Sequence, residues 1–131
     1  MDIELRKQQS ETRQTRIIFP VDLNDHDTLF GGNILKWMDE VAYITAIRFC
    51  RQDMVTVSVD KISFNQPLPV GTIAEIVGRV TDVGNVRIKV NVSVFSEQSD
   101  TDEKQKVIEG QFYFAAINKE HKLARLAIPA K

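Results

Sequence analysis

The chain has 131 residues, a length that suits one domain with a hydrophobic core of its own. Its 17 lysine and arginine residues are balanced by 18 aspartate and glutamate residues, so no basic excess favours nucleic acid. The single cysteine, Cys50, excludes an internal disulfide framework and fits a reducing compartment. No apolar run is long enough for a transmembrane helix and the first 16 residues do not resemble a signal peptide, so we expect a cytosolic protein without membrane contact.

The first 50 residues predict one short strand and one long helix. Residues 1–15 are polar without a hydrophobic period, which is typical of a flexible arm or an irregular helix. Residues 16–19 form a short apolar run that predicts a strand ending at Pro20. Residues 33–50 contain no glycine or proline and repeat apolar side chains at intervals of three and four. They predict a helix that other elements cover on most sides.

From residue 54 onward the apolar period changes to two. Strands are predicted over residues 55–64, 72–83, 86–96 and 107–118, separated by a Pro/Gly connection over 65–71, a turn at Gly84-Asn85 and a polar loop over 97–106. Gly78 inside a strand indicates a bulge or a close backbone approach. The order of elements predicts an α+β fold in which an antiparallel sheet wraps one long helix. We expect a single domain over residues 1–131, with a C-terminal tail over 119–131.

Candidate chemistry is concentrated in the loop and helix start over residues 24–40. Gly31 and Gly32 lie at the predicted helix N-terminus, where backbone N–H groups are free and the helix dipole favours negative charge. Asp39 shares a helix face with apolar neighbours, and a carboxylate in such a place is costly unless it is paired or used. The alternatives are a satisfied polar group for Asp39 and a turn or cap residue for Asn24. Glu40 is expected to form a solvated ion pair with Lys36.

Other reaction classes have little support in the sequence. The histidines His26 and His121 are placed without a metal-ligand spacing, so no metal site is expected. No serine lies in a nucleophile elbow or is paired with a histidine, which argues against a Ser-His-Asp hydrolase. His121 lies in a basic stretch of the tail that either contacts phosphates or is simply solvated.

The chain resembles the hotdog-fold acyl-CoA thioesterases, in the branch of the bacterial acyl-CoA thioester hydrolases and the mammalian brain-type acyl-CoA hydrolase. The resemblance spans roughly residues 16–118 and is carried by Asn24, the Leu29-Phe30-Gly31-Gly32 tetrapeptide, Trp37-Met38-Asp39-Glu40, Thr56-Val57-Ser58-Val59-Asp60, Phe64, Pro67 and Val70-Gly71. It implies hydrolysis of acyl-CoA to a free acid and CoA, without a cofactor beyond the CoA of the substrate.

The resemblance also implies an assembly and a site. Two protomers pair edge to edge, the active sites lie at their interface, and the family commonly forms hexamers as trimers of dimers. Asn24 of one protomer faces Asp39 of its partner; Asp39 acts as general base or nucleophile, and Asn24 orients water or the thioester. The N–H groups at Gly31 and Gly32 suit the carbonyl oxygen on which charge develops. Thr56, Asn85 and Arg87 are expected to contact CoA or the rest of the substrate.

Two departures from the family pattern stand out. Asp27 lies where relatives usually have glycine, which adds a carboxylate near the expected thioester. Val86-Arg87 replaces a hydroxyl pair after the turn at Gly84-Asn85, and Arg87 brings a cation. The main alternative is a hotdog module that binds acyl-CoA as a sensor without hydrolysing it. A dehydratase of the same fold is a further rival, but neither histidine lies on the helix or on the strand that faces it.

Overall fold

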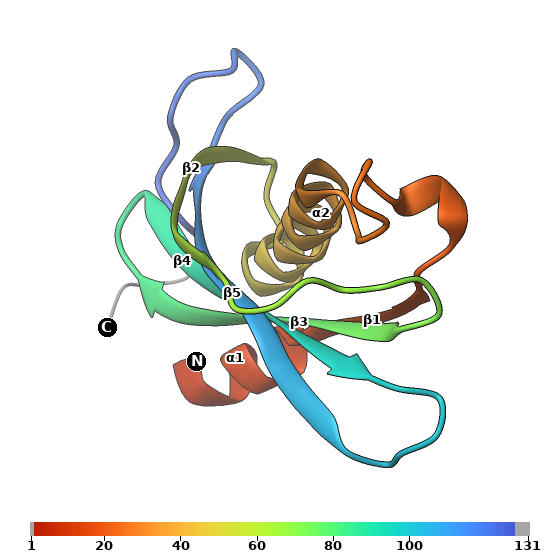
Figure 1. The fold of residues 1–131 in the computed structure, drawn as a ribbon. Helices are drawn as coiled ribbons and strands as arrows, with labels where there is room; N and C mark the ends of the chain where they lie inside the picture. Colours follow the sequence, from red (N-terminus) through yellow and green to blue (C-terminus); the bar gives the residue numbers. More distant parts are fainter. Residues whose placement is uncertain (1, 128–131) are drawn as a thin grey trace.

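The long helix α2 lies in the concave face of a curved antiparallel sheet, with β2 curling over one side of it (Figure 1). The computed structural model describes residues 2–127. In chain order the elements are α1 (Ile3–Ser10), β1 (Thr12–Ile17), the 3-10 turn η1 (Pro20–Asp22), α2 (Gly31–Cys50), β2 (Met54–Phe64), β3 (Ile73–Val83), β4 (Arg87–Glu97) and β5 (Lys104–Ala116). The strand order is β1-β3-β4-β5-β2, so β1 and β2 form the two edges. The predicted sheet around a central helix is confirmed.

The core lies between α2 and the inner face of the sheet. Alternation along β4 turns Val90, Val92 and Val94 toward α2, where all three are fully buried. The buried side of α2 consists of Ile34, Trp37, Met38, Val41, Ala42, Thr45, Ala46, Phe49 and Cys50. These positions follow the spacing of three and four that predicted the helix. None of the helices in residues 2–127 is long and apolar enough to cross a membrane.

Gly78 marks the closest approach of α2 to the sheet. A Cβ atom at Gly78 would lie 2.7 Å from Thr45 Oγ1 and 3.0 Å from Val41 Cγ1. The pairing there is regular, because Gly78 lies opposite Thr12 on one side and Val92 on the other. Of the two interpretations of this glycine, the close approach is therefore correct, and the bulge in β3 falls further along.

The N-terminal segment is more ordered than the sequence indicates. Residues 3–10 form α1, which is capped when Asp2 accepts a hydrogen bond from the N–H of Leu5, and β1 begins at Thr12. The Arg6 Nε atom donates a 2.8 Å hydrogen bond to the carbonyl of Phe49 at the end of α2. Of the two alternatives for residues 1–15, the flexible arm is wrong from residue 3 onward, because contacts with distant parts of the chain hold this polar segment. The helix is present, but it is regular, covers only residues 3–10 and is followed by β1.

Several predicted boundaries also move. β1 covers residues 12–17 rather than 16–19, α2 starts two residues earlier than expected, and β5 begins at Lys104, which shortens the preceding loop. The expected tail is partly structured, since Ile117 pairs with Leu123 and the Gln52 side chain bonds the backbone of Arg125 and Ala127. The rest of that predicted tail, residues 128–131, lies outside the described residues.

Two bulges interrupt the period of two in β2. They fall between Thr56 and Ser58 and between Asp60 and Ser63. Each bulge adds one residue without a partner and so shifts which side chains face inward. Residues paired across a sheet share a face, and Thr56, Val59 and Phe64 lie opposite Phe114, Phe112 and Ile108. All of these side chains therefore lie on the helix side of the sheet.

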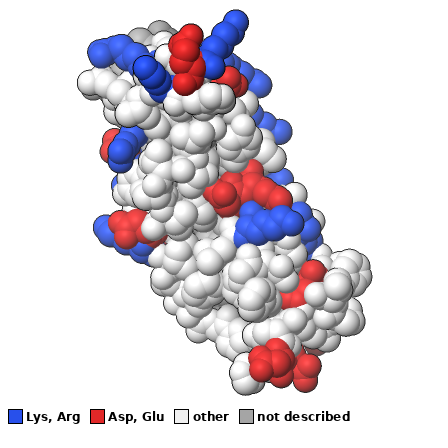
Figure 2. Space-filling view, turned by 90° about the horizontal axis from the view of Figure 1, so that it is seen from above, with Lys and Arg blue, Asp and Glu red and all other residues white. Residues whose placement is uncertain are grey.

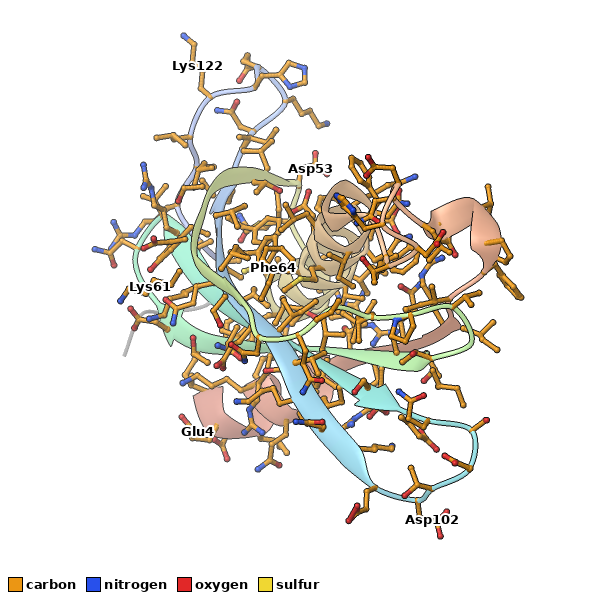
Figure 3. All side chains as sticks on the ribbon, in the orientation of Figure 1. Glu4, Asp53, Lys61, Phe64, Asp102 and Lys122 are labelled. Carbon is orange, nitrogen blue, oxygen red and sulfur yellow. The ribbon has the colours of Figure 1, made fainter. Side chains whose placement is uncertain are left out.

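The second bulge turns neighbouring side chains in opposite directions. Lys61 has a left-handed backbone conformation, with φ of 53°, and its N–H is bound by the Asp60 side chain. Figure 3 shows Lys61 on the outside of β2 and Phe64 between β2 and α2. Ile62 packs against the core between them. The bulge thus places an isoleucine on the inner face at a position where uninterrupted alternation from Val59 would predict the opposite face.

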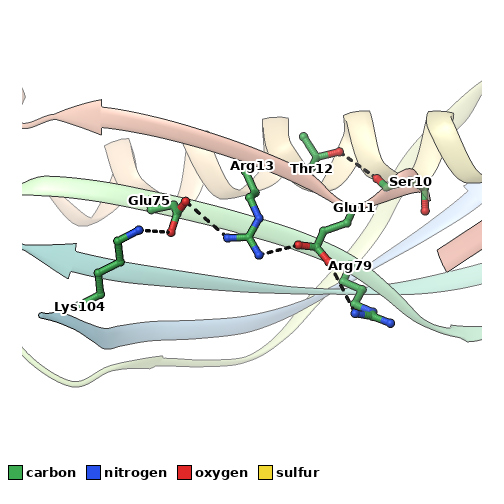
Figure 4. A network of polar contacts seen from close by, with 7 residues as sticks. All are labelled: Ser10, Glu11, Thr12, Arg13, Glu75, Arg79 and Lys104. Carbon is green, nitrogen blue, oxygen red and sulfur yellow. Dashed lines mark hydrogen bonds and ion pairs between the residues drawn. The ribbon is translucent and has the colours of Figure 1, made fainter. Parts of the chain in front are cut away.

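The outer face of the sheet carries a chain of ion pairs that joins β1, β3 and β5 (Figure 4). Glu75 contacts Arg13 at 3.5 Å and Lys104 at 3.3 Å. Arg13 also contacts Glu11 at 2.8 Å, and Glu11 contacts Arg79 at 3.6 Å. The two faces therefore differ in chemistry: apolar side chains on the inner face form the core, and alternating charges cover part of the outer face.

Candidate active site

The loop before α2 is held together by the side chain of Asn24. The Asn24 Oδ1 atom accepts hydrogen bonds from the N–H of His26 at 2.7 Å and the N–H of Thr28 at 3.2 Å. The Nδ2 group donates to Thr28 Oγ1, and the Asn24 N–H donates to the Thr28 carbonyl. Asn24 thus acts as a turn residue within its own chain, one of the two roles expected for it. No recorded contact joins it to Asp39 within residues 2–127 of one chain.

Asp27 has a left-handed backbone conformation in this loop, with φ of 64°. Glycine adopts this conformation without steric cost, and aspartate is among the few other residues that tolerate it. The resemblance placed glycine at this position in relatives, and the backbone angle gives the physical reason. Asp27 keeps the turn but adds an exposed carboxylate to the loop.

Helix α2 begins at the glycine pair without a side-chain cap. Its N-cap residue is Phe30, and within residues 2–127 no acceptor is recorded for the N–H of Gly31 or Gly32. A Cβ at Gly31 would meet no atom within 4 Å, whereas a Cβ at Gly32 would lie 2.8 Å from the exposed Phe30 ring. Free N–H groups at a helix N-terminus are suited to a carbonyl oxygen that gains negative charge.

Asp39 lies about two turns after the start of α2 and is half-buried. It accepts a hydrogen bond from β2. The Thr56 hydroxyl donates a 3.0 Å hydrogen bond to Asp39 Oδ1. This contact exists because the first bulge begins after Thr56, which keeps the threonine on the inner face. The sequence placed Thr56 among substrate contacts, and the structure adds a bond to the candidate catalytic carboxylate.

An open groove of about 500 Å³ runs from Asp39 along the junction of α2 and β2. Its polar lining lies along α2 and consists of Gly32, Lys36 and Asp39. The remaining lining residues are apolar and come from α2, β2 and β5: Leu35, Val59, Ile62, Phe64 and Phe112. Gly31 instead lines a smaller pocket of about 230 Å³ beside residues 64–68. A carboxylate and the start of the helix, two turns apart on α2, thus both line a largely apolar groove.

The surface around this groove carries few charges. Figure 2 views the molecule from above, the side on which α2 and β2 lie in Figure 1, and shows a largely uncharged face. Lysine, arginine and acidic side chains gather at one end, a small group of both signs lies near the middle, and acidic side chains lie at the opposite end. Exposed apolar side chains of β2 that line the groove are Val59 and Phe64, which are 45% and 51% exposed. Such a surface favours contact with an apolar ligand or another protein.

Other predicted site residues lie elsewhere in the single chain. Arg87 alternates with the buried Ile88, so its side chain lies on the outer face of the sheet, opposite from Asp39. Asn85 lies in the turn before β4, and its carbonyl accepts a bond from Leu126. Glu40 pairs with Arg16 at 3.6 Å rather than with Lys36, so that prediction is wrong. The Arg16 guanidinium also covers the Trp37 ring at 4.5 Å.

The family-model comparison matches the thioesterase superfamily over residues 26–103, more than half of the chain. The matched region begins in the loop before α2 and contains α2 and β2 through β4, so it includes Asp39 and every groove residue except Phe112. The chain belongs to the thioesterase superfamily.

Individual relatives agree with this assignment. An uncharacterized acyl-CoA thioester hydrolase of Bacillus subtilis, YkhA, is 33% identical over 114 residues, which cover 87% of this chain and 66% of the relative. The chain thus spans slightly less than two thirds of that protein. An apo-hexameric acyl-CoA thioesterase has a similar structure, with a TM-score of 0.87 at 32% identity over 92% of this chain and 77% of the other.

The acyl-CoA hydrolase of Staphylococcus aureus, solved with butyryl coenzyme A, coenzyme A and coenzyme A disulfide, gives a TM-score of 0.89 at 28% identity. The match covers 95% of this chain and 74% of that one. Structures of the same enzyme exist with an aspartate, an asparagine or a threonine replaced by alanine. With these neighbours, the predicted hotdog fold is confirmed.

Sequence reasoning identified Gly32 and Asp39 but missed the apolar side chains that line the groove. Ile62 and Phe64 belong to a strand that was predicted correctly, but a regular period does not reveal which of its side chains face α2. The one available signal was Gly110, a gap in the inward row of β5 between Ile108 and Phe112. A gap of this kind indicates that a side chain from another element fills it.

Proposed function

We propose that this chain hydrolyses acyl-CoA thioesters to a free carboxylic acid and CoA. The observation that carries the proposal is the position of Asp39, which is bonded by Thr56 and lines a largely apolar groove between α2 and β2. In the reaction the thioester C–S bond breaks, water supplies the oxygen of the new acid, and a proton ends on the CoA sulfur. Water is the second substrate, with neither metal nor cofactor.

Asp39 removes the proton from the attacking water or attacks the carbonyl itself. A general base contributes on the order of 10²–10⁴-fold to such a reaction. The developing oxyanion lies near the helix N-terminus, where fixed N–H donors stabilise negative charge by roughly 3 kcal/mol each. In this proposal Gly31 and Gly32 supply these donors from the protomer that also supplies Asn24, and Asp39 comes from the neighbouring protomer. Within one chain, seven residues of helix separate Gly32 from Asp39 by about 10 Å, so the two do not serve the same carbonyl.

The residue spacing in the S. aureus enzyme supports these roles. The asparagine, aspartate and threonine replaced there are separated by 15 and then 17 residues. Asn24, Asp39 and Thr56 have the same separations in this chain. Asn24 then serves the site formed by Asp39 of the neighbouring protomer, which agrees with the absence of a recorded contact between them within residues 2–127 of one chain.

A homodimer is the smallest assembly in this proposal. β2 is an edge strand whose side chains are mostly exposed, and a long unpaired edge favours pairing with a second copy. Pairing at β2 uses one edge, so a hexamer such as that of the solved thioesterase requires a second interface between dimers. We propose the dimer through β2 and a hexamer of three dimers, in the cytosol.

CoA contacts form a separate part of the proposal. Thr56 lies beside the reacting part of the substrate, because its hydroxyl binds Asp39. Arg87 and Asn85 lie away from Asp39 of their own chain, so a role in binding CoA phosphates requires that they serve a site on another protomer. Measuring KM for an acyl-CoA against that for a short acyl thioester without the nucleotide, in Arg87→Ala, tests this role. A selective rise for the acyl-CoA supports it, and an equal response to both substrates contradicts it.

Hydrolysis itself is tested with the purified protein and a series of acyl-CoAs, with release of free CoA as the readout. Asp39→Asn keeps the shape of the side chain and is expected to lower kcat at least about a hundredfold. Glu40→Gln, one position along the same helix, is the matched control and should stay near wild type. Tight binding of acyl-CoA without any turnover would instead support the sensor alternative.

A further inference from the structure

Ile62 occupies a gap in the inner face of the sheet. Along β5 the inward positions are Ile108, Gly110 and Phe112, so the glycine leaves a space between two large side chains. A Cβ atom at Gly110 would overlap Ile62 Cδ1 and would lie 3.5 Å from Met38 Cε. Ile62 therefore lies across β5 and reaches toward α2, in the space that the missing side chain provides.

The bulge in β2 is what directs Ile62 to this place. The pairing shifts between Asp60 and Ser63, and Lys61 takes the left-handed conformation that turns the strand. Because of this shift, Ile62 joins Val59 and Phe64 in the lining of the groove. Val59 and Phe64 remain 45% and 51% exposed in the single chain, so the groove has apolar walls that face solvent.

The groove has a polar side and an apolar side. Asp39, Lys36 and Gly32 lie along α2, and Leu35 together with the apolar side chains of β2 and β5 forms the rest. A thioester has the same division, with a reactive carbonyl joined to a hydrocarbon chain. In the proposed dimer a second copy supplies Asn24 beside Asp39, which completes the reacting site and brings the thioester carbonyl to this groove. The continuity of the groove with Asp39 therefore favours substrate as its occupant.

We infer that this groove binds the acyl chain of the substrate and that Ile62, lying over Gly110, limits the length of chain it accepts. The inference rests on the proposed function and adds a specificity-determining residue to it. A chain that extends past Ile62 has to displace a side chain that is packed against the core. Substrates with acyl chains short enough to end at Ile62 are therefore preferred.

The test compares wild type with Ile62→Ala and Ile62→Phe over straight-chain acyl-CoAs from butyryl to palmitoyl. Ile62→Ala opens the gap over Gly110, so the chain length with the highest kcat/KM should increase by about two carbons. Ile62→Phe fills the groove, so the chain length with the highest kcat/KM should decrease. Each methylene of the acyl chain that the groove newly accommodates or excludes changes kcat/KM by a factor on the order of ten.

Gly110→Ala provides an independent variant. Its added methyl group pushes Ile62 toward the groove, so the preference should shift to shorter chains. In the double variant Ile62→Ala/Gly110→Ala the two changes oppose each other, and the profile should return toward wild type. Ile17→Ala, an exposed isoleucine on the opposite edge of the sheet, is the control and should leave the profile unchanged.

A second readout separates this inference from the proposed function. Affinities for non-hydrolysable thioether analogues of the same acyl-CoAs are measured for each variant, together with the oligomeric state. One outcome is that no acyl-CoA is cleaved, but analogue affinity still depends on chain length and shifts in Ile62→Ala. The proposed hydrolysis is then wrong, and the binding of the acyl chain in this groove is supported. If Ile62→Ala leaves both profiles unchanged, or changes only the oligomeric state, the groove does not hold the acyl chain and the inference is wrong.

Discussion

The Thr56 hydroxyl donates a 3.0 Å hydrogen bond to the carboxylate of Asp39, which links β2 to α2 at the candidate site. A bonded carboxylate has a fixed rotamer, and a fixed base aims at one position in the groove. The same bond is made possible by the bulge that follows Thr56. The orientation of the proposed base therefore depends on the backbone of an edge strand.

Removal of the Thr56 hydroxyl should impair turnover more than folding. Thr56→Val keeps the shape of the side chain but cannot donate to Asp39, and the loss of a hydrogen bond to a charged group corresponds to roughly 1.5–3 kcal/mol. We expect kcat to fall about tenfold or more, with a small change in thermal stability. Thr56→Ser restores the donor and should recover much of the rate; equal losses in both variants would indicate that the methyl group matters instead.

Mixing two inactive variants should restore activity if each site uses two chains. Asn24→Ala and Asp39→Asn each lose one half of the proposed site, but a mixed dimer contains one complete site. After the two are unfolded and refolded together, about a quarter of wild-type activity is expected for random pairing. Each variant refolded alone is the control. Activity that does not rise on mixing would place Asn24 and Asp39 in the same site of one chain.

Asp27 should make the free energy of unfolding lower than it would be with glycine at this position. Its φ of 64° favours glycine, so Asp27→Gly is expected to raise the free energy of unfolding by about 0.5–1 kcal/mol. Asp27→Asn tolerates the same conformation and should remain close to wild type, whereas the β-branched Asp27→Val should lose at least about 1 kcal/mol. Urea unfolding measures all three, and an order in which valine is best would contradict the backbone argument.

Cys50 should make the fold less stable at high pH. Burial raises the pKa of its thiol from 9.0 to about 11, and the Arg6 guanidinium nearby opposes part of the rise. The unfolded chain loses this proton at lower pH than the folded chain, so the stabilising contribution is complete below pH 9.0 and is lost as pH rises toward 11. Between about pH 8 and about pH 10.5, wild type should lose about 2 kcal/mol more than Cys50→Ala. Urea unfolding at both pH values measures the difference; equal losses would exclude a role for the thiol.

The sequence predicted the helix and the strands well because both are recorded in local periodicity. Apolar residues at intervals of three and four identified α2 to within two residues at its start. The α1 helix was harder to see, because its stability depends on Arg6 reaching Phe49, a contact between residues far apart in the chain. Propensity and period do not report such contacts.

The candidate site was predicted in part, for a similar reason. Asp39 and the glycine pair stand out from the sequence because a carboxylate on an apolar helix face and a helix start without a cap are local anomalies. The contact of Asp39 with Thr56 depends on strand register, which two bulges alter. Glu40 pairs with Arg16 instead of Lys36 because β1 passes close to α2. A rule based on helical spacing does not consider neighbours from other elements.

The two bulges also allow β2 to lose a residue without changing the groove. Val57 is the extra residue of the first bulge, and its deletion would leave Thr56 opposite Phe114 and Ser58 opposite Tyr113, as they are now. In a strand without a bulge, the same deletion would turn every side chain on one side of it to the other face of the sheet. Deleting Val57 should therefore leave Thr56 and Phe64 facing α2, whereas a deletion in the regular part of β4 should disrupt the core.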